Sequence, residues 1–157
     1  MAVQKTNAMR ILDKNKIKYE IIEYDISDGK IDGVSVAEKT NQDVKEVYKT
    51  LVTQGNTKTL YVFVIPVNEE LDLKKAAKVC GEKKIDMIQV NDILKLTGYI
   101  RGGCSPVGMK KLYKTFIQID AEQLERICVS GGKKGLQIKL SPEDLRSSVN
   151  AIFADII

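Results

Sequence analysis

Apolar positions along the chain recur at helical spacing in some segments and at strand spacing in others. Helical spacing behind a capping side chain predicts five helices. They cover residues 6–15, 35–39, 73–80, 92–97 and a last segment that begins at Ser141. Ser35, which has the capping-box spacing to Glu38, and Asn91 are the predicted caps of the second and fourth helices.

Runs rich in β-branched residues predict strands between these helices. They cover residues 19–24, 50–54, 59–67, 99–101, 115–120, 126–130 and 136–140. The turn residues 55–58 predict a hairpin, and the glycine-rich residues 131–135 predict a tight turn between the last two strands. We expect the last helix to bury the apolar residues Leu145, Val149, Ile152 and Phe153. Strands and helices alternate irregularly, which favours a mixed α/β (α+β) fold over a doubly wound parallel sheet.

The length of 157 residues favours one domain, residues 1–157, with a hydrophobic core of its own. The N-terminus lacks the apolar stretch of a signal peptide, and no run approaches the ~20 apolar residues of a membrane span. We therefore expect a soluble, cytoplasmic protein that does not bind a membrane.

The chain contains no histidine, which excludes several kinds of active site. A Ser-His-Asp triad, a Cys-His pair and histidine-ligated zinc are all impossible. The three cysteines, Cys80, Cys104 and Cys128, never have the C-x-x-C spacing, so neither a disulfide framework nor a zinc knuckle is expected. We expect Cys80 and Cys128 to lie in the core. The sequence predicts no metal and no cofactor.

The charged residues give a net charge of +4, with 25 lysines and arginines against 21 acids. Only four are arginine, the side chain that reads base edges best, whereas lysine suits phosphate as a point charge. The composition fits contact with a nucleic acid backbone, and equally a solvated lysine-rich surface.

Two glycine-rich segments are candidates for binding loops. Residues 98–108 contain four glycines, and their backbone N–H groups are candidates for holding an oxyanion or a carbonyl; a plain turn is the alternative. Cys104 lies in this segment without a partner that would activate it as a nucleophile. Residues 129–135 form the second segment, with Ser130 as a hydrogen-bonding hydroxyl.

Lys49 differs from the other lysines because apolar residues surround it at a predicted helix–strand junction. A lysine in such a place presents its ammonium to a cleft, where it meets a phosphate or a developing oxyanion. The alternative is a side chain that covers apolar surface and keeps its charge in water.

Five short segments together resemble the YbaK family of aminoacyl-tRNA deacylases, which is related to the editing domain of prolyl-tRNA synthetase. In order and spacing they are residues 47–51 (VYKTL), 71–76 (LDLKKA), 98–99 (GY), 102–108 (GGCSPVG) and 129–135 (VSGGKKG). The similarity runs from about Lys5 to Ile156. It implies a curved, largely antiparallel sheet flanked by helices.

The resemblance also implies the residues of an aminoacyl pocket. Lys49 is then the catalytic lysine, near the terminal adenosine and the ester of an aminoacyl-tRNA acceptor end. The implied substrate-binding residues are Tyr24, Gly102, Gly103, Cys104, Ser105, Pro106, Ser130, Gly131 and Gln137. Prolyl-tRNA synthetase is the implied protein partner. Gln137 departs from the family, which usually has aspartate there, and Cys104 replaces a commonly aliphatic residue.

The implied activity is clearance of mischarged Cys-tRNA(Pro), or of Cys-tRNA(Cys), by attack of the cysteinyl thiol on its own ester. Such chemistry requires no histidine and no enzyme nucleophile. Two alternatives stay open. One is hydrolysis of Ala-tRNA(Pro) by water, and the other, suggested by Gln137, is a tRNA-binding module without activity.

Overall fold

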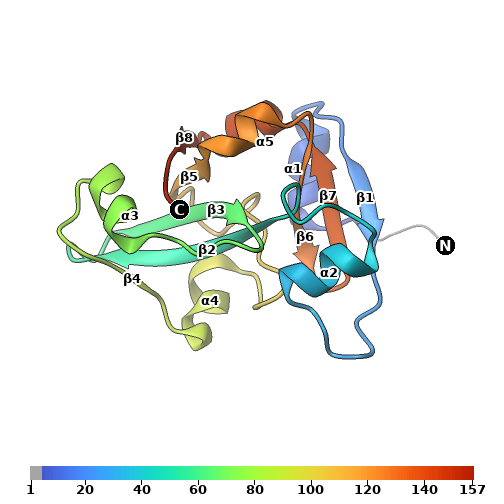
Figure 1. Cartoon of the computed structure of the whole chain (residues 1–157), viewed down its shortest axis with the longest axis horizontal. Helices are drawn as coiled ribbons and strands as arrows, with labels where there is room; N and C mark the ends of the chain where they lie inside the picture. The colour runs from blue at the N-terminus through green and yellow to red at the C-terminus, as the bar shows by residue number, and fades with distance from the viewer. Residues whose placement is uncertain (1–4) are drawn as a thin grey trace.

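The computed structural model describes residues 5–157 and divides their strands between two sheets (Figure 1). The smaller sheet is antiparallel, in the order β1 (Glu20–Glu23), β7 (Leu136–Leu140), β6 (Ile127–Lys133). The larger has the order β4 (Ile85–Met87), β2 (Tyr48–Gly55), β3 (Leu60–Pro66), β5 (Lys114–Gln118), β8 (Ile152–Ala154). Its first three strands are antiparallel, and β5 and β8 are added in parallel.

Helices pack around both sheets. They are α1 (Asn7–Lys14), α2 (Gly33–Lys39), α3 (Leu73–Cys80), α4 (Val90–Thr97) and α5 (Pro142–Val149), with a short 3-10 helix η1 (Ile119–Gln123). In Figure 1, α1 and α2 accompany the smaller sheet, and α3 lies over the far end of the larger one. The prediction of a mixed α/β fold with helices around a largely antiparallel sheet is confirmed, with the strands divided between two sheets.

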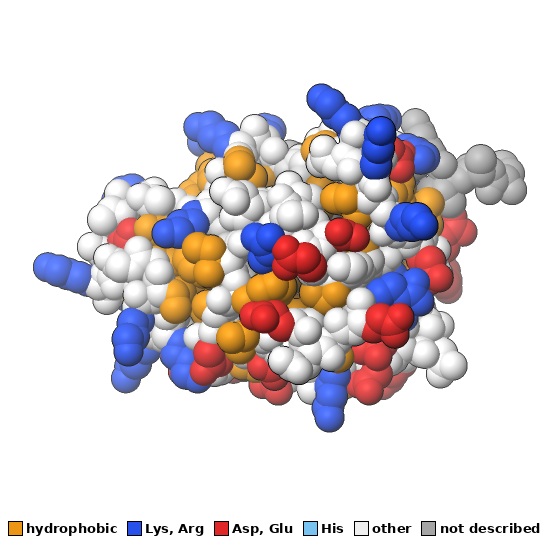
Figure 2. Space-filling view, turned by 90° about the horizontal axis from the view of Figure 1, so that it is seen from above, with side chains coloured by type: hydrophobic (Ala, Val, Ile, Leu, Met, Phe, Trp, Pro, Cys, Tyr) orange, Lys and Arg blue, Asp and Glu red, His pale blue; other side chains and the backbone are white. Residues whose placement is uncertain are grey.

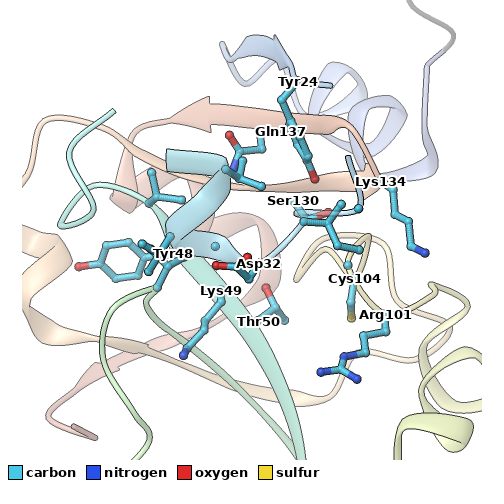
Figure 3. Close-up of a pocket in the computed structure, with 18 residues that line it drawn as sticks. Tyr24, Asp32, Tyr48, Lys49, Thr50, Arg101, Cys104, Ser130, Lys134 and Gln137 are labelled. Atoms are coloured by element: carbon cyan, nitrogen blue, oxygen red, sulfur yellow. The ribbon is translucent and has the colours of Figure 1, made fainter. Parts of the chain in front are cut away.

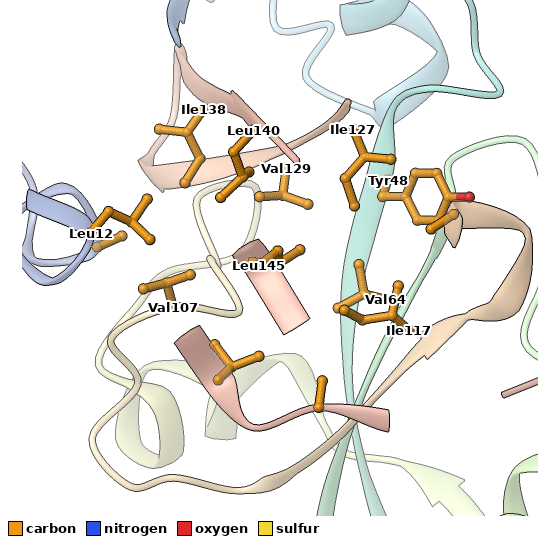
Figure 4. Close-up of a cluster of buried hydrophobic side chains, with 14 of the residues drawn as sticks. Leu12, Tyr48, Val64, Val107, Ile117, Ile127, Val129, Ile138, Leu140 and Leu145 are labelled. Atoms are coloured by element: carbon orange, nitrogen blue, oxygen red, sulfur yellow. The ribbon is translucent and has the colours of Figure 1, made fainter. Parts of the chain in front are cut away.

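Apolar clusters pack against both faces of the β2–β3 hairpin, and one of them joins the two sheets. One cluster joins Val64 of β3 to Ile138 of β7, Leu12 of α1 and Leu145 of α5 (Figure 4). The other packs Phe63 and its neighbours against α3, with the rings of Phe63 and Phe116 stacked 5.6 Å apart. Since both faces of the hairpin are packed, the chain position where β2 begins is fixed relative to β6 and β7.

Two predicted helix caps are wrong. Asp32, not Ser35, caps α2 by accepting a hydrogen bond from the backbone N–H of Ser35. The reason is tertiary: a Cβ on Gly33 would lie 2.2 Å from Cγ1 of Val67, so only glycine fits in this first turn. Helix α4 begins at Val90, behind Gln89, so Asn91 lies inside the helix.

Two strand predictions and the predicted extent of the last helix also need correction. Residues 99–101 form a turn, because Gly98 and Gly102 adopt positive φ angles of 85° and 87° on either side. Ile152 and Phe153 belong to β8, not to the last helix, which Asn150 ends in the left-handed conformation at φ 54°. The strand expected over 115–120 ends at Gln118, where η1 follows.

Within residues 5–157, no helix has both the length and the apolar character needed to cross a membrane.

Candidate active site

The site is built around a gap in the pairing of β2. At its start, Val47 forms a bridge to Cys128 of β6, and at its end β4 pairs with residues 53–55. Between these contacts the edge of β2 is open. Because Val47 and Val67 form a hydrogen-bonded antiparallel pair, odd-numbered residues of β2 direct their backbone groups to β3. The backbone N–H and C=O of Thr50 therefore face the open edge.

A cavity of about 640 Å³ lies along this edge. Its walls come from the start of α2, from β6 and β7, and from the glycine-rich loop after α4 (Figure 3). Asp32 is the one carboxylate among the residues that line it, and Lys49, Arg101 and Lys134 are the three cations. The chamber therefore carries a net positive charge.

Lys49 lies half-buried in the wall of this cavity. Within residues 5–157, no carboxylate lies within 4.0 Å of its ammonium, and its side chain makes no hydrogen bond. Burial lowers the pKa of Lys49, while the negative charges of Glu70 and Glu69 oppose this effect in part. The ammonium is thus free to meet an anion supplied by a ligand.

Thr50, next to Lys49, is a pocket residue that the sequence did not single out. Its hydroxyl is buried at the cavity and has no hydrogen-bond partner within the described chain. A buried hydroxyl without a partner is destabilising by about 1–3 kcal/mol, which a bound ligand would relieve. The only sequence signal for it is its place beside Lys49.

Only some residues of the glycine-rich loop face the cavity. Gly102 and Cys104 line it, whereas Gly103, Ser105 and Pro106 are buried behind them. The N–H of Gly103 donates to the carbonyl oxygen of Ile100 at 2.9 Å, so this amide is already engaged. The loop therefore contributes shape to the pocket more than it contributes free amide donors.

Cys104 is poorly placed to act as a nucleophile. Burial raises the pKa of its thiol to about 11, although its contact with the hydroxyl of Thr97 slightly opposes this. Burial also raises the pKa of Cys80 to about 11 and that of Cys128 to about 12. Cys128 is fully buried as expected, and Cys80 is partly buried. All three thiols stay protonated near neutral pH.

Tyr24, Ser130 and Gln137 also line the cavity (Figure 3). The side chain of Gln137, only 6% exposed, accepts a hydrogen bond from Nε2 of Gln42 at 3.1 Å. Gly131 does not line the cavity; its carbonyl oxygen accepts a hydrogen bond from the hydroxyl of Thr6. Of the ten residues predicted for the site, the structure brings six to the cavity: Tyr24, Lys49, Gly102, Cys104, Ser130 and Gln137.

The loop before α2 supplies the remaining wall, and Lys39 holds it in place. The Lys39 ammonium donates to the carbonyl oxygens of Asp25 and Lys30, each at 2.7 Å, and to Oδ1 of Asp28 at 2.6 Å. Its side chain is only 20% exposed. One ammonium thus fixes three points of the segment that leads to Ile31 and Asp32, which line the cavity.

Replacing Lys39 with methionine should lower the free energy of unfolding by about 1–3 kcal/mol, because three oxygens lose a charged donor. Limited proteolysis should then cut the chain between residues 25 and 31. Urea unfolding and mass spectrometry of the fragments test this. Lys45→Met is the matched control, since Lys45 is exposed and makes no hydrogen bond through its side chain within the described chain. Equal stability and equal protease resistance of the two variants would contradict the proposed clamp.

No group of three or more His, Cys, Asp or Glu side chains in the described part of the chain is arranged to hold a metal ion.

Comparison with known proteins agrees with this geometry. The aminoacyl-tRNA editing domain family matches residues 31–147, which include all the pocket walls except Tyr24 and Gly29. A protein of Enterococcus faecalis named "Putative Cys-tRNA(Pro)/Cys-tRNA(Cys) deacylase EbsC" is 48% identical over 153 residues, covering 98% of this chain and 93% of that protein. An uncharacterized protein of Bacillus subtilis, YwhH, is 21% identical over 87% of this chain and 86% of its own.

Two solved structures share the fold. A hypothetical protein superimposes with a TM-score of 0.88 at 19% identity, over 96% of this chain and 99% of its own. A structure described as a putative trans-editing enzyme for prolyl tRNA synthetase gives a TM-score of 0.82 at 22% identity, over 98% of each chain. With the family match and the 48% identical relative, the chain belongs to the aminoacyl-tRNA editing domain family, as its resemblance to YbaK proteins predicted.

Proposed function

We propose that this protein removes cysteine from mischarged tRNA, chiefly from Cys-tRNA(Pro) and also from Cys-tRNA(Cys). The observation that carries the proposal is an unpaired, half-buried Lys49 in a positively charged cavity, in a chain 48% identical to a relative named for this activity. The cavity of about 640 Å³ has room for an aminoacyl group and the terminal adenosine.

The reaction that fits this pocket uses the thiol of the substrate. The cysteinyl sulfur, as thiolate, attacks the carbonyl carbon of its own ester, and a carbon–sulfur bond forms. The bond between that carbon and the ribose oxygen then breaks, and the ribose oxygen takes up a proton. The products are a cyclic cysteine thiolactone and tRNA with a free terminal hydroxyl. No oxidant or enzyme nucleophile takes part, in keeping with the high pKa of about 11 of Cys104.

Lys49 and Thr50 have separate tasks in this reaction. The ammonium of Lys49 stabilises the negative charge that develops on the carbonyl oxygen. The Thr50 hydroxyl and backbone N–H, which have no partner on the open edge, orient the aminoacyl group. The pocket also accelerates the reaction by holding the thiol near the carbonyl carbon. The attack then takes place within one oriented molecule, where the effective concentration of the thiol is high.

Gln137 bears on how the amino acid is held. Its Oε1 is occupied by Gln42, so its amide N–H groups are left for the cavity. An amide in this place suits a carbonyl or a thiolate of the substrate, whereas an aspartate would suit an ammonium. Gln137 therefore changes how the substrate is bound and leaves the thiol-driven step intact.

A deacylation panel tests the proposed function. Purified protein is incubated with cysteinyl-, alanyl-, seryl- and prolyl-tRNA(Pro), and loss of each ester is measured. We expect rapid loss of cysteine alone. Preferred loss of alanine would favour water-driven editing of Ala-tRNA(Pro) instead. Binding of tRNA without loss of any amino acid would favour a binding module.

The three cysteines of the protein should react slowly with alkylating reagents. At a pKa of about 11 or above, each thiol carries at least about 300-fold less thiolate at pH 7.5 than a free cysteine of pKa about 8.5. Native protein and glutathione are treated with iodoacetamide at this pH, and the adducts are counted by mass spectrometry. Rapid labelling of Cys104 would contradict this expectation and would support Cys104 as a nucleophile of the enzyme.

A further inference from the structure

Two cations stand on the side of the cavity away from Lys49, and the proposed chemistry does not use them. Figure 3 shows Arg101 and Lys134 together on this side, with Thr50 and Asp32 between them and Lys49. Neither cation has a carboxylate within 4.0 Å in the described part of the chain. Both are therefore free to bind an anion at the cavity mouth.

The backbone fixes the two cations relative to one another. The Cγ and Cε atoms of Lys134 each lie 3.5 Å from where a Cβ on Gly102 would stand, so the Lys134 stem lies against the residue after Arg101. A Cβ on Gly103 would lie 3.0 Å from the backbone nitrogen of Lys134 and 3.1 Å from the Cα of Lys133. Glycine at position 103 lets these two loops touch. The loop that carries Arg101 thus packs against the backbone at Lys134, which keeps the two cationic residues on neighbouring loops.

The face drawn in Figure 2 shows no single concentration of cations. On the face drawn in Figure 2, lysines and arginines are spread around the outline, with acidic side chains among them. The lining of the cavity has three cations to one carboxylate, and Asp32 already accepts a hydrogen bond as the cap of α2. The cations therefore outnumber the acids in the lining of the cavity.

We propose that Arg101 and Lys134 form a binding site for the phosphodiester backbone at the single-stranded 3′ end of the tRNA. This inference rests on the proposed function for the identity of the nucleic acid. This site would fix the orientation of the bound tRNA. The phosphates lie against Arg101 and Lys134, and the ester lies on the other side of the cavity, near Lys49. Guanidinium and ammonium groups suit this role, since phosphate accepts a bidentate arginine as well as a point charge.

Binding of uncharged tRNA(Pro) tests the site without any reaction. The dissociation constants of the wild type, Arg101→Gln and Lys134→Gln are measured over a series of salt concentrations. Each variant should bind more weakly, and its slope of log K against log salt should be shallower by about 0.7, the value for one phosphate contact on a single strand. Lys133→Gln is the matched control, because Lys133 is exposed and does not line the cavity. Its slope should match that of the wild type.

A second substrate separates a phosphate contact from general damage to the pocket. Cysteinyl adenosine, an ester without phosphate, should lose much less kcat/KM in both variants than Cys-tRNA(Pro) does. Equal slopes in all four proteins, or an equal loss in Lys133→Gln, would overturn the site. If the slopes change as expected while no aminoacyl-tRNA is deacylated, the phosphate site stands and the proposed function fails.

Discussion

Lys49→Ala should lower the rate of Cys-tRNA(Pro) deacylation by about 100-fold or more, the usual effect of removing one group that stabilises an oxyanion. The physical reason is the position of this ammonium: no carboxylate of the described chain lies within 4.0 Å of it, and its half-buried position reduces the screening of its charge by water. Single-turnover measurements with saturating protein give the chemical rate directly.

Two controls separate loss of charge from loss of structure. Lys45→Ala removes an exposed lysine from the same segment and should leave the rate unchanged. Lys49→Arg keeps a cation and should retain more activity than Lys49→Ala. A Lys49→Ala protein that folds and works as well as the wild type would exclude Lys49 from the reaction.

The pH dependence of the deacylation rate should also reflect the protonation state of Lys49. The rate should rise with pH as the cysteinyl thiol ionises, and it should fall again as Lys49 loses its proton. Since burial lowers the pKa of Lys49, this fall should come at a lower pH than an exposed lysine would give. Lys49→Arg should move the fall to higher pH, because the guanidinium keeps its proton.

Local sequence signals predicted most helices and strands of this fold because those elements are marked by residues close in the chain. Helix α3 covers residues 73–80 as predicted, with Asp72 and Gly81 as its caps, and the hairpin of β2 and β3 forms around its turn residues. The wrong predictions concern elements whose structure depends on contacts between residues far apart in the chain. Strands β4 and β8 have three residues each, too few for an alternating pattern, and they exist because neighbouring strands offer an edge.

Only those residues of the candidate site that lie in short, recognisable motifs could be predicted from the sequence. Lys49 and Ser130 lie in recognisable segments, and both line the cavity. Thr50 and Arg101 were missed because nothing local distinguishes them. Only the fold shows that the Thr50 hydroxyl has no partner within residues 5–157 and that Arg101 lines the same cavity. Ser105 and Pro106 lie in a motif too, yet the loop folds them away from the cavity.

Replacing the thiol of the substrate with a hydroxyl should also lower the rate of deacylation strongly. A cysteinyl thiol of pKa about 8.5 is already a few per cent thiolate at pH 7, whereas a serine hydroxyl is a weak nucleophile unless a base activates it. The chain has no histidine to serve as that base. Ser-tRNA(Pro) should therefore react at least about 100-fold more slowly than Cys-tRNA(Pro).

S-methylcysteinyl-tRNA(Pro) is the matching control for size. Its sulfur is close to that of cysteine in position and bulk, but as a thioether it is unable to form the thiolate that attacks the ester. We expect it to bind with an affinity similar to that of the cysteinyl substrate and to be deacylated as slowly as the seryl one. Fast loss of the methylated amino acid would point to water as the attacking group.

The ratio of kcat/KM for Cys-tRNA(Pro) to that for Ser-tRNA(Pro), measured with the same protein at the same pH, tests the central claim most directly. A pocket that relies on the substrate thiol predicts a ratio of about 100 or more. A ratio near one would contradict this account and assign the attack to water.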